Sequence, residues 1–193
     1  MLKQPPLVLA SSSPYRRSLL AALGLEFDVD APDIDETIST GEAPADAVLR
    51  LAAEKTRTVA ERRPEAVILG GDQCAVIDGD IIGKPGNREN AEAQLRRASG
   101  RTVTFLSAVT VVADNRLEQE LVPVYVRFRD LDDATIRRYV EADRPFDCAG
   151  AIRSEGLGAS LLTAIDASDP SALVGLPQIT VCRLLRGFGF QLP

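Results

Sequence analysis

The sequence contains no histidine and no tryptophan, and the absence of histidine excludes several classes of enzyme. Without an imidazole the chain cannot build a Ser-His-Asp or Cys-His nucleophile, a histidine-ligated metal centre or an imidazole proton shuttle. Any catalysis must therefore use carboxylates, lysine, arginine, tyrosine, cysteine or backbone groups. A metal that takes part should be one that prefers oxygen ligands, as Mg²⁺ does.

Cysteine is scarce as well. Cys74, Cys148 and Cys182 lie far apart, and none belongs to a CxxC pair. Their odd number and wide spacing suggest neither a disulfide framework nor a zinc cluster. We expect reduced thiols in a cytoplasmic protein, where small cysteine side chains usually belong to the core.

Long apolar runs and an excess of positive charge are also missing. Polar residues interrupt every apolar run before the ~20 residues of a membrane helix, and the N-terminal run is too short for a secretory signal. The net charge of −6 argues against binding along a nucleic-acid backbone. We therefore expect no membrane or nucleic-acid partner, and one domain over residues 1–193.

The pattern of apolar residues predicts a mixed α/β fold. An apolar run at 6–10 indicates a strand, and the Ser-Ser-Ser-Pro that follows predicts a helix over 14–23, because serine caps helices and proline suits their first position. Further helices are expected at 43–62, 87–99, 132–141 and 178–186. Extended runs lie at 25–29, 66–70, 75–82 with a turn at Asp78-Gly79, 102–112 and 117–128 around Asp114-Asn115, and 160–165.

The junction between the first strand and the first helix is the clearest local signal for a ligand. A helix N-terminus offers unpaired N–H groups and partial positive charge to an anion. Arg16 and Arg17 would be unfavourable there unless an anion is bound. An ordinary strand-to-helix junction without a ligand gives the same pattern, so both interpretations stay open.

Acidic residues gather at two places. Asp33, Asp35 and Glu36 share a loop, and Asp72 directly follows a predicted buried strand, a position that ligands favour in open α/β sheets. If these carboxylates meet in space, they could hold Mg²⁺ and position a water for attack on a phosphoryl group. Solvated loop residues and a turn cap are the plain alternatives.

Three more charged residues have two interpretations each. Lys84, in Gly-Lys-Pro, could reach a phosphate oxygen or could mark the exit of a strand. Lys55 lies within a helix and would ordinarily be a surface residue. Glu155, between glycines, could contact a flat ligand or belong to a surface turn.

Taken in order, eight motifs resemble those of the Maf family of nucleotide pyrophosphatases. They are LASSSPYRRSLL (9–20), PDIDET (32–37), RLAAEK (50–55), GGDQ (70–73), GKP (83–85), VRFRDL (126–131), CAGAIRSEG (148–156) and LVGLP (173–177). Each is weak alone, but their order and spacing are specific. The resemblance implies an inosine-triphosphatase-like mixed sheet with two lobes around a cleft, often dimeric. It also implies release of pyrophosphate from a nucleoside triphosphate with Mg²⁺, Mn²⁺ or Co²⁺.

The resemblance also implies roles for individual residues. Asp72 matches the catalytic carboxylate that activates water, and Ser11 and Arg16 match the phosphate-binding loop. The positions that coordinate metal or phosphate are matched by Glu36, Lys55 and Lys84. On this resemblance Glu36 and Asp72 are the expected metal ligands.

Three positions bear on the preferred base. Gln73 and Glu155 resemble the branch that hydrolyses 7-methyl-GTP, whereas the pyrimidine branch usually has Thr and Gln there. Glu155 could accept the N1 and N2 hydrogens of the cationic ring, and Tyr15 could stack on it, although Trp is usual at that position. The alternatives are a dTTP or UTP pyrophosphatase and a nucleotide-binding regulator of septum formation.

Overall fold

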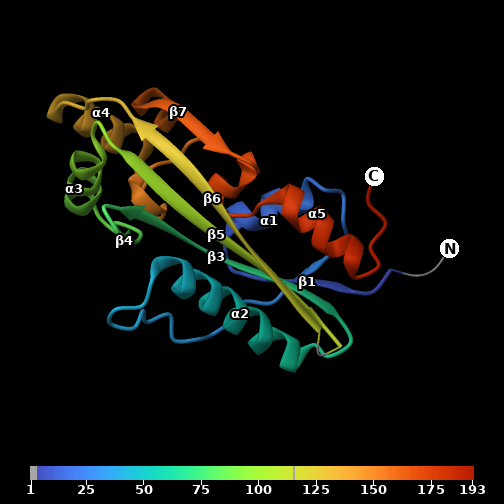
Figure 1. Ribbon diagram of the computed structural model, residues 1–193. Helices are drawn as coiled ribbons and strands as arrows, with labels where there is room; N and C mark the ends of the chain where they lie inside the picture. The colour runs from blue at the N-terminus through green and yellow to red at the C-terminus, as the bar shows by residue number, and fades with distance from the viewer. Residues whose placement is uncertain (1–3, 115) are drawn as a thin grey trace.

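A computed structural model of the chain describes residues 4–114 and 116–193, which form one seven-stranded sheet with helices on both faces (Figure 1). The strands are β1 (Leu7–Ala10), β2 (Asp28–Val29), β3 (Val67–Ile77), β4 (Asp80–Ile82), β5 (Thr102–Ala113), β6 (Arg116–Phe128) and β7 (Leu162–Ala167). The α-helices are α1 (Pro14–Ala21), α2 (Pro44–Arg62), α3 (Arg88–Ala98), α4 (Asp133–Asp143) and α5 (Gln178–Gly187). Short 3₁₀ helices are η1 (Ala149–Ala151), η2 (Leu157–Leu161) and η3 (Pro170–Val174). The predicted mixed α/β fold is confirmed.

The sheet runs in the order β2-β1-β3-β5-β6-β7, and β4 pairs with β3. β1 is parallel to β2 and β3, while the other pairings are antiparallel. β5 and β6 form the predicted long hairpin, of which Asn115 lies outside the described residues. β3 and β4 turn at Asp78 and Gly79, whose φ angles of 53° and 88° suit the predicted two-residue turn.

Side chains of β3 and β5 alternate between two covered faces. On one face Leu69 and Val109 pack with α1 and α5, and farther along the same strands Ile77 and Phe105 pack with α3 and α4. The opposite face packs against α2 through residues such as Ile68 (Figure 1). Two separate apolar clusters on one face therefore correspond to the two lobes that the resemblance implies.

The position of Asp72 differs from the prediction. Asp72 does not follow a strand, because β3 continues through the two glycines Gly70 and Gly71 to Ile77. The strand that ends here is β1: its pairing with β3 stops at Ala10–Gly70. The pairing of β4 with β3 begins only at Ala75. Among the described residues, positions 71–74 therefore have no partner strand on this edge of the sheet.

The ends of some elements also differ from the prediction. α1 stops at Ala21, two residues before the predicted Leu23, and the turn that follows contains Gly24 with a φ of 70°. β2 is limited to Asp28–Val29, shorter than the predicted run at 25–29. In the described part of the chain, no helix has the length and apolar character needed to cross a membrane.

Candidate active site

The interruption in the edge of the sheet opens into a cavity of about 550 Å³. Its wall is built from the β1–α1 loop, α2, the middle of β3, the segment after β4 and the segment at 147–155. Every residue to which the resemblance gives a role lines it: Ser11, Tyr15, Arg16, Glu36, Lys55, Asp72, Gln73, Lys84 and Glu155. Asp33 and Asp35 are not among the described residues that line it.

A buried lysine brings two carboxylates together at one end of the cavity. Lys55 lies on the covered face of α2 and is only 6% exposed, so its interpretation as a surface residue is wrong. Its Nζ atom donates to Asp72 Oδ1 and to Glu36 Oε2, each at 2.7 Å. Asp72 is buried in β3, whereas the Glu36 side chain is 61% exposed. Glu36 and Asp72, one from each of the two acidic places in the sequence, thus meet around one ammonium group.

The acidic pair suits a cation that arrives with its substrate. The described residues contain no group of three or more Cys, Asp or Glu side chains arranged to hold a metal ion. Mg²⁺ is commonly bound by one or two carboxylates together with phosphate oxygens and waters. Glu36 and Asp72 therefore fit a divalent ion shared with a polyphosphate better than a permanently bound one.

The β1–α1 loop presents a helix start to the cavity. Ser13 is the N-cap of α1, because its Oγ accepts from the Arg16 amide at 3.4 Å, as the sequence predicts. Ser11 is buried, and its Oγ accepts from the Ser13 amide at 3.1 Å. The loop therefore has a defined shape that turns the N-terminal end of α1 toward the cavity, a favourable place for an anion.

Arg16 is held in place by the residue that follows η3. Its Nε donates to the carbonyl oxygen of Gly175 at 2.9 Å. Burial lowers the pKa of the Arg16 guanidinium, while Asp72 and Glu36 act to raise it. Arginine is not deprotonated in proteins, so the side chain stays charged. Arg16, Lys55 and the exposed Lys84 give this end of the cavity three cations.

Gln73 points away from Asp72, because successive residues of a strand face opposite sides of the sheet. Its Nε2 lies 2.9 Å from Ser107 Oγ, 2.8 Å from the carbonyl oxygen of Ala172 and 3.1 Å from that of Leu173. Ser107 Oγ itself donates to the Ala172 carbonyl at 2.7 Å. These bonds join η3 to the sheet, a function that no motif predicted for Ser107. Gln73 therefore uses its N–H groups within the protein and shapes the wall of the cavity.

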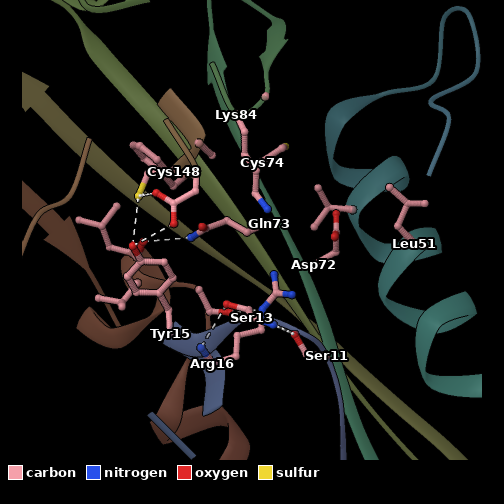
Figure 2. A pocket seen from close by; sticks show the side chains of 18 of the residues that line it. Ser11, Ser13, Tyr15, Arg16, Leu51, Asp72, Gln73, Cys74, Lys84 and Cys148 are labelled. Carbon is pink, nitrogen blue, oxygen red and sulfur yellow. Dashed lines mark hydrogen bonds between the residues drawn. The ribbon is translucent and has the colours of Figure 1, made fainter. Parts of the chain in front are cut away.

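Tyr15 lies at the end of the cavity opposite Asp72 and near Cys148 (Figure 2). Its hydroxyl donates to Asp147 Oδ2 at 3.2 Å, and the Arg153 guanidinium lies 6.0 Å from the ring centroid. Burial, followed by contact with Cys148, raises the pKa of Tyr15 to about 12, so the phenol is neutral near pH 7. No sequence pattern predicted a role for Asp147 or Arg153, although Arg153 lies within one of the eight motifs.

Glu155 lies at the rim of the cavity. It is exposed, and its Oε2 accepts from Ser154 Oγ at 2.9 Å. This leaves carboxylate oxygen free to accept further hydrogen bonds, since each oxygen has two lone pairs. The described part of the chain contains Cys74, Cys148 and Cys182 as free thiols. Cys74 is buried in the core as expected, whereas Cys148 and Cys182 are half-buried and Cys148 lines the cavity.

The chain is thus an α/β protein whose cavity has cations and a helix start at one end and the Tyr15 ring at the other. Residues 6–188 match the family described as Maf-like protein, and the chain belongs to this family. The resemblance seen in the eight motifs is thereby confirmed.

Several relatives match over almost their whole length. The 7-methyl-GTP pyrophosphatase of Xanthomonas oryzae pv. oryzae (strain MAFF 311018) is 51% identical, over 98% of this chain and 100% of the relative. The proteins of the same name from Alkalilimnicola ehrlichii and Pseudomonas aeruginosa are each 48% identical. The first covers 100% of this chain and 98% of its own length, and the second covers 98% and 100%.

Two solved structures show weaker similarity. Protein VC0702 from Vibrio cholerae has a TM-score of 0.48 and 11% identity, over 98% of this chain and 100% of that chain. The Ham1 protein of Staphylococcus aureus has a TM-score of 0.46 and 16% identity, over 66% of this chain and 72% of that chain. The assignment to the family is therefore based on the family match and on the relatives with about 50% sequence identity, and not on these two structures.

Proposed function

We propose that this chain is a nucleotide pyrophosphatase that hydrolyses 7-methyl-GTP to 7-methyl-GMP and pyrophosphate. The observation that carries the proposal is the buried Lys55, which brings Asp72 and Glu36 together beside the start of α1. Relatives of about half identity that are named 7-methyl-GTP pyrophosphatase support the choice of substrate.

The triphosphate binds at the cationic end of the cavity. Arg16, Lys84 and the N–H groups at the start of α1 neutralise its oxygens, and Ser11 fixes the shape of the loop. Glu36 and Asp72 would hold a divalent ion, Mg²⁺, Mn²⁺ or Co²⁺, that supplies charge neutralisation for the triphosphate.

Asp72 acts as the base. Lys55 donates to Asp72 Oδ1, so Oδ2 is left to accept the proton of a water that attacks the α-phosphorus in line. The bond between the α-phosphorus and the oxygen that bridges it to the β-phosphorus breaks, and pyrophosphate leaves with that oxygen. Because Lys55 is itself buried and hydrogen-bonded, it holds the Asp72 carboxylate in one orientation.

The base binds at the other end. The 7-methylguanine ring is cationic, so it stacks on the neutral Tyr15 ring with a cation–π contribution. The Glu155 carboxylate accepts the hydrogens of N1 and N2 and balances the ring charge. Gln73 acts through η3, which it ties to the sheet.

The biological role follows from this chemistry. Hydrolysis of a methylated nucleotide removes it from the pool of triphosphates, a house-cleaning activity. We propose that the chain works in the cytoplasm as a single Maf-like domain, and that it forms a homodimer.

A panel of nucleotides tests the proposed function. Purified protein is assayed for pyrophosphate release from 7-methyl-GTP, GTP, dTTP and UTP, with Mg²⁺ and with a chelator. We expect pyrophosphate release from 7-methyl-GTP but not from the other nucleotides, and we expect the chelator to abolish it. Faster release from dTTP or UTP would move the chain to the pyrimidine branch, and intact triphosphates throughout would refute the proposal.

Replacing Glu155 tests how the base is recognised. Glu155→Gln keeps the shape but removes the negative charge. GTP also carries the N1 and N2 hydrogens, so the ratio of kcat/KM for 7-methyl-GTP over GTP reports only the charge balance with the methylated ring. Exposed ion pairs contribute about 0.2–1 kcal/mol, so we expect this ratio to fall up to about fivefold. Glu141→Gln, at an exposed glutamate outside the cavity, is the matched control. An unchanged ratio in Glu155→Gln would remove Glu155 from base recognition.

A further inference from the structure

A second hollow of about 380 Å³ adjoins the base end of the cavity. Four residues line both spaces: Ser154, Glu155, Leu173 and Val174. Glu155 therefore stands at the boundary between them.

The rest of the hollow is apolar. The residues that line only this hollow are Ile165, Ala167 and Pro170, and Glu155 is the one charged residue in its wall among those described. Ile165 belongs to β7, at the edge of the sheet, and is 47% exposed. A large aliphatic side chain with half its surface in water gains free energy when an apolar group covers it.

We infer that this hollow is an extension of the base site, which takes an apolar substituent on the exocyclic N2 of guanine. The inference rests on the proposed function and on the contact of Glu155 with the N1 and N2 hydrogens. In that pose one N2 hydrogen bonds to Glu155, and the other points along the purine edge toward N3. An alkyl group in place of this second hydrogen passes the carboxylate, enters the hollow and covers Ile165. The substrates therefore include N2-alkylated guanosine triphosphates.

A homologous series of substrates tests the inference. N2-methyl, N2-ethyl, N2-propyl and N2-butyl derivatives of 7-methyl-GTP are assayed for pyrophosphate release beside 7-methyl-GTP itself. Burial of each methylene contributes about 0.8 kcal/mol, so kcat/KM should rise about fourfold for each added carbon. A series that stays flat or falls with chain length would overturn the inference.

A variant of the hollow provides the second arm. Ile165→Glu places a charge among the apolar walls, so we expect the rise along the series to vanish while turnover of 7-methyl-GTP is retained. Ile179→Glu is the matched control, because Ile179 is 61% exposed on α5 and lines neither space. We expect this control to keep the rise.

The other outcomes are distinguishable. A rise that persists in Ile165→Glu would overturn the inference. A change in the mass of Ile165→Glu by light scattering, with the substrate series unaffected, would identify the hollow as a contact between copies of the chain and would also overturn it. No turnover of unsubstituted 7-methyl-GTP would overturn the proposed function, and the inference with it.

Discussion

Lys55 shows how a single charge organises the site. A buried ammonium is unfavourable unless other charges and hydrogen bonds compensate it. Asp72 and Glu36 provide this compensation, each at 2.7 Å. Sequence alone could not reveal it, because lysines within helices are almost always exposed. The burial of Lys55 depends on residues that are 17 and 19 positions away in the chain.

Asp72→Asn tests the base directly. The amide keeps the shape of the carboxylate but cannot accept a proton from water, so we expect kcat to fall ~10²–10⁴-fold. Lys55 keeps Glu36 as a partner, and circular dichroism should show a folded protein at the assay temperature. Asp33→Asn, outside the cavity, serves as the control with near-normal turnover. Turnover of Asp72→Asn close to that of the unmodified protein would contradict the assignment.

The raised pKa of the Cys74 thiol predicts that the folded protein loses stability at high pH. Burial, followed by the nearby Asp72 charge, raises the pKa of this thiol from 9.0 to about 12. The unfolded chain loses the thiol proton first, so the contribution is complete below pH 9 and is lost as the pH rises toward 12. Its slope is at most about 1.4 kcal/mol per pH unit.

Urea unfolding between pH 8 and pH 10.5 would detect this loss. We expect the free energy of unfolding to fall less steeply with pH in Cys74→Ala than in the unmodified protein, because the raised thiol pKa is absent from the variant. Curves of equal slope would show that Cys74 titrates alike in both states.

At the scale of elements, the main difference from the sequence-based prediction is that β3 continues through Gly70 and Gly71. Two consecutive glycines are typical of a strand end, yet here they let the strand pass close to its neighbours. A Cβ atom on Gly70 would lie 2.1 Å from Thr56 Oγ1, and one on Gly71 would lie 2.7 Å from the Ala108 carbonyl oxygen. The glycines thus allow α2 and β5 to pack tightly on the part of β3 that carries Asp72.

Gly70→Ala should therefore destabilise the fold. Overpacking of this kind costs typically 1–3 kcal/mol, which urea unfolding would measure. Thr56→Ala removes the clashing hydroxyl, so the double variant should recover part of the loss and show non-additive effects. Gly83→Ala is the control, because a Cβ atom there meets nothing within 4 Å. Strictly additive effects of Gly70→Ala and Thr56→Ala would contradict the packing account.

The elements differ in how well sequence predicted them, and the range of the interactions explains why. The start of α1 and the turn at Asp78-Gly79 were predicted correctly, because their signals lie within a few residues. The attachment of η3 to the sheet was not predicted, since Gln73 and Ala172 are 99 residues apart. The motifs identified the lining residues through family resemblance, but only the fold shows that Gln73 bonds within the protein.

At the scale of the whole molecule, the cavity depends on a missing stretch of sheet. β1 stops at Ala10 and β4 begins pairing at Ala75, so the edge of β3 between them is open. Cations gather on one side of this opening although the net charge of the chain is −6. Three cations beside the carboxylates of Asp72 and Glu36 leave this end with only a small net positive charge, which suits a compact polyanion that brings its own divalent cation. The net charge predicts that the chain does not bind along a nucleic-acid backbone, whereas the three-dimensional arrangement explains what the cavity can bind.

The central claim is that water attacks the α-phosphorus of 7-methyl-GTP in this cavity. The most direct test is hydrolysis in ¹⁸O-labelled water with Mg²⁺, followed by mass spectrometry of both products. We predict that the label appears in 7-methyl-GMP and not in pyrophosphate. Label in pyrophosphate, or release of 7-methyl-GDP and inorganic phosphate, would contradict the account.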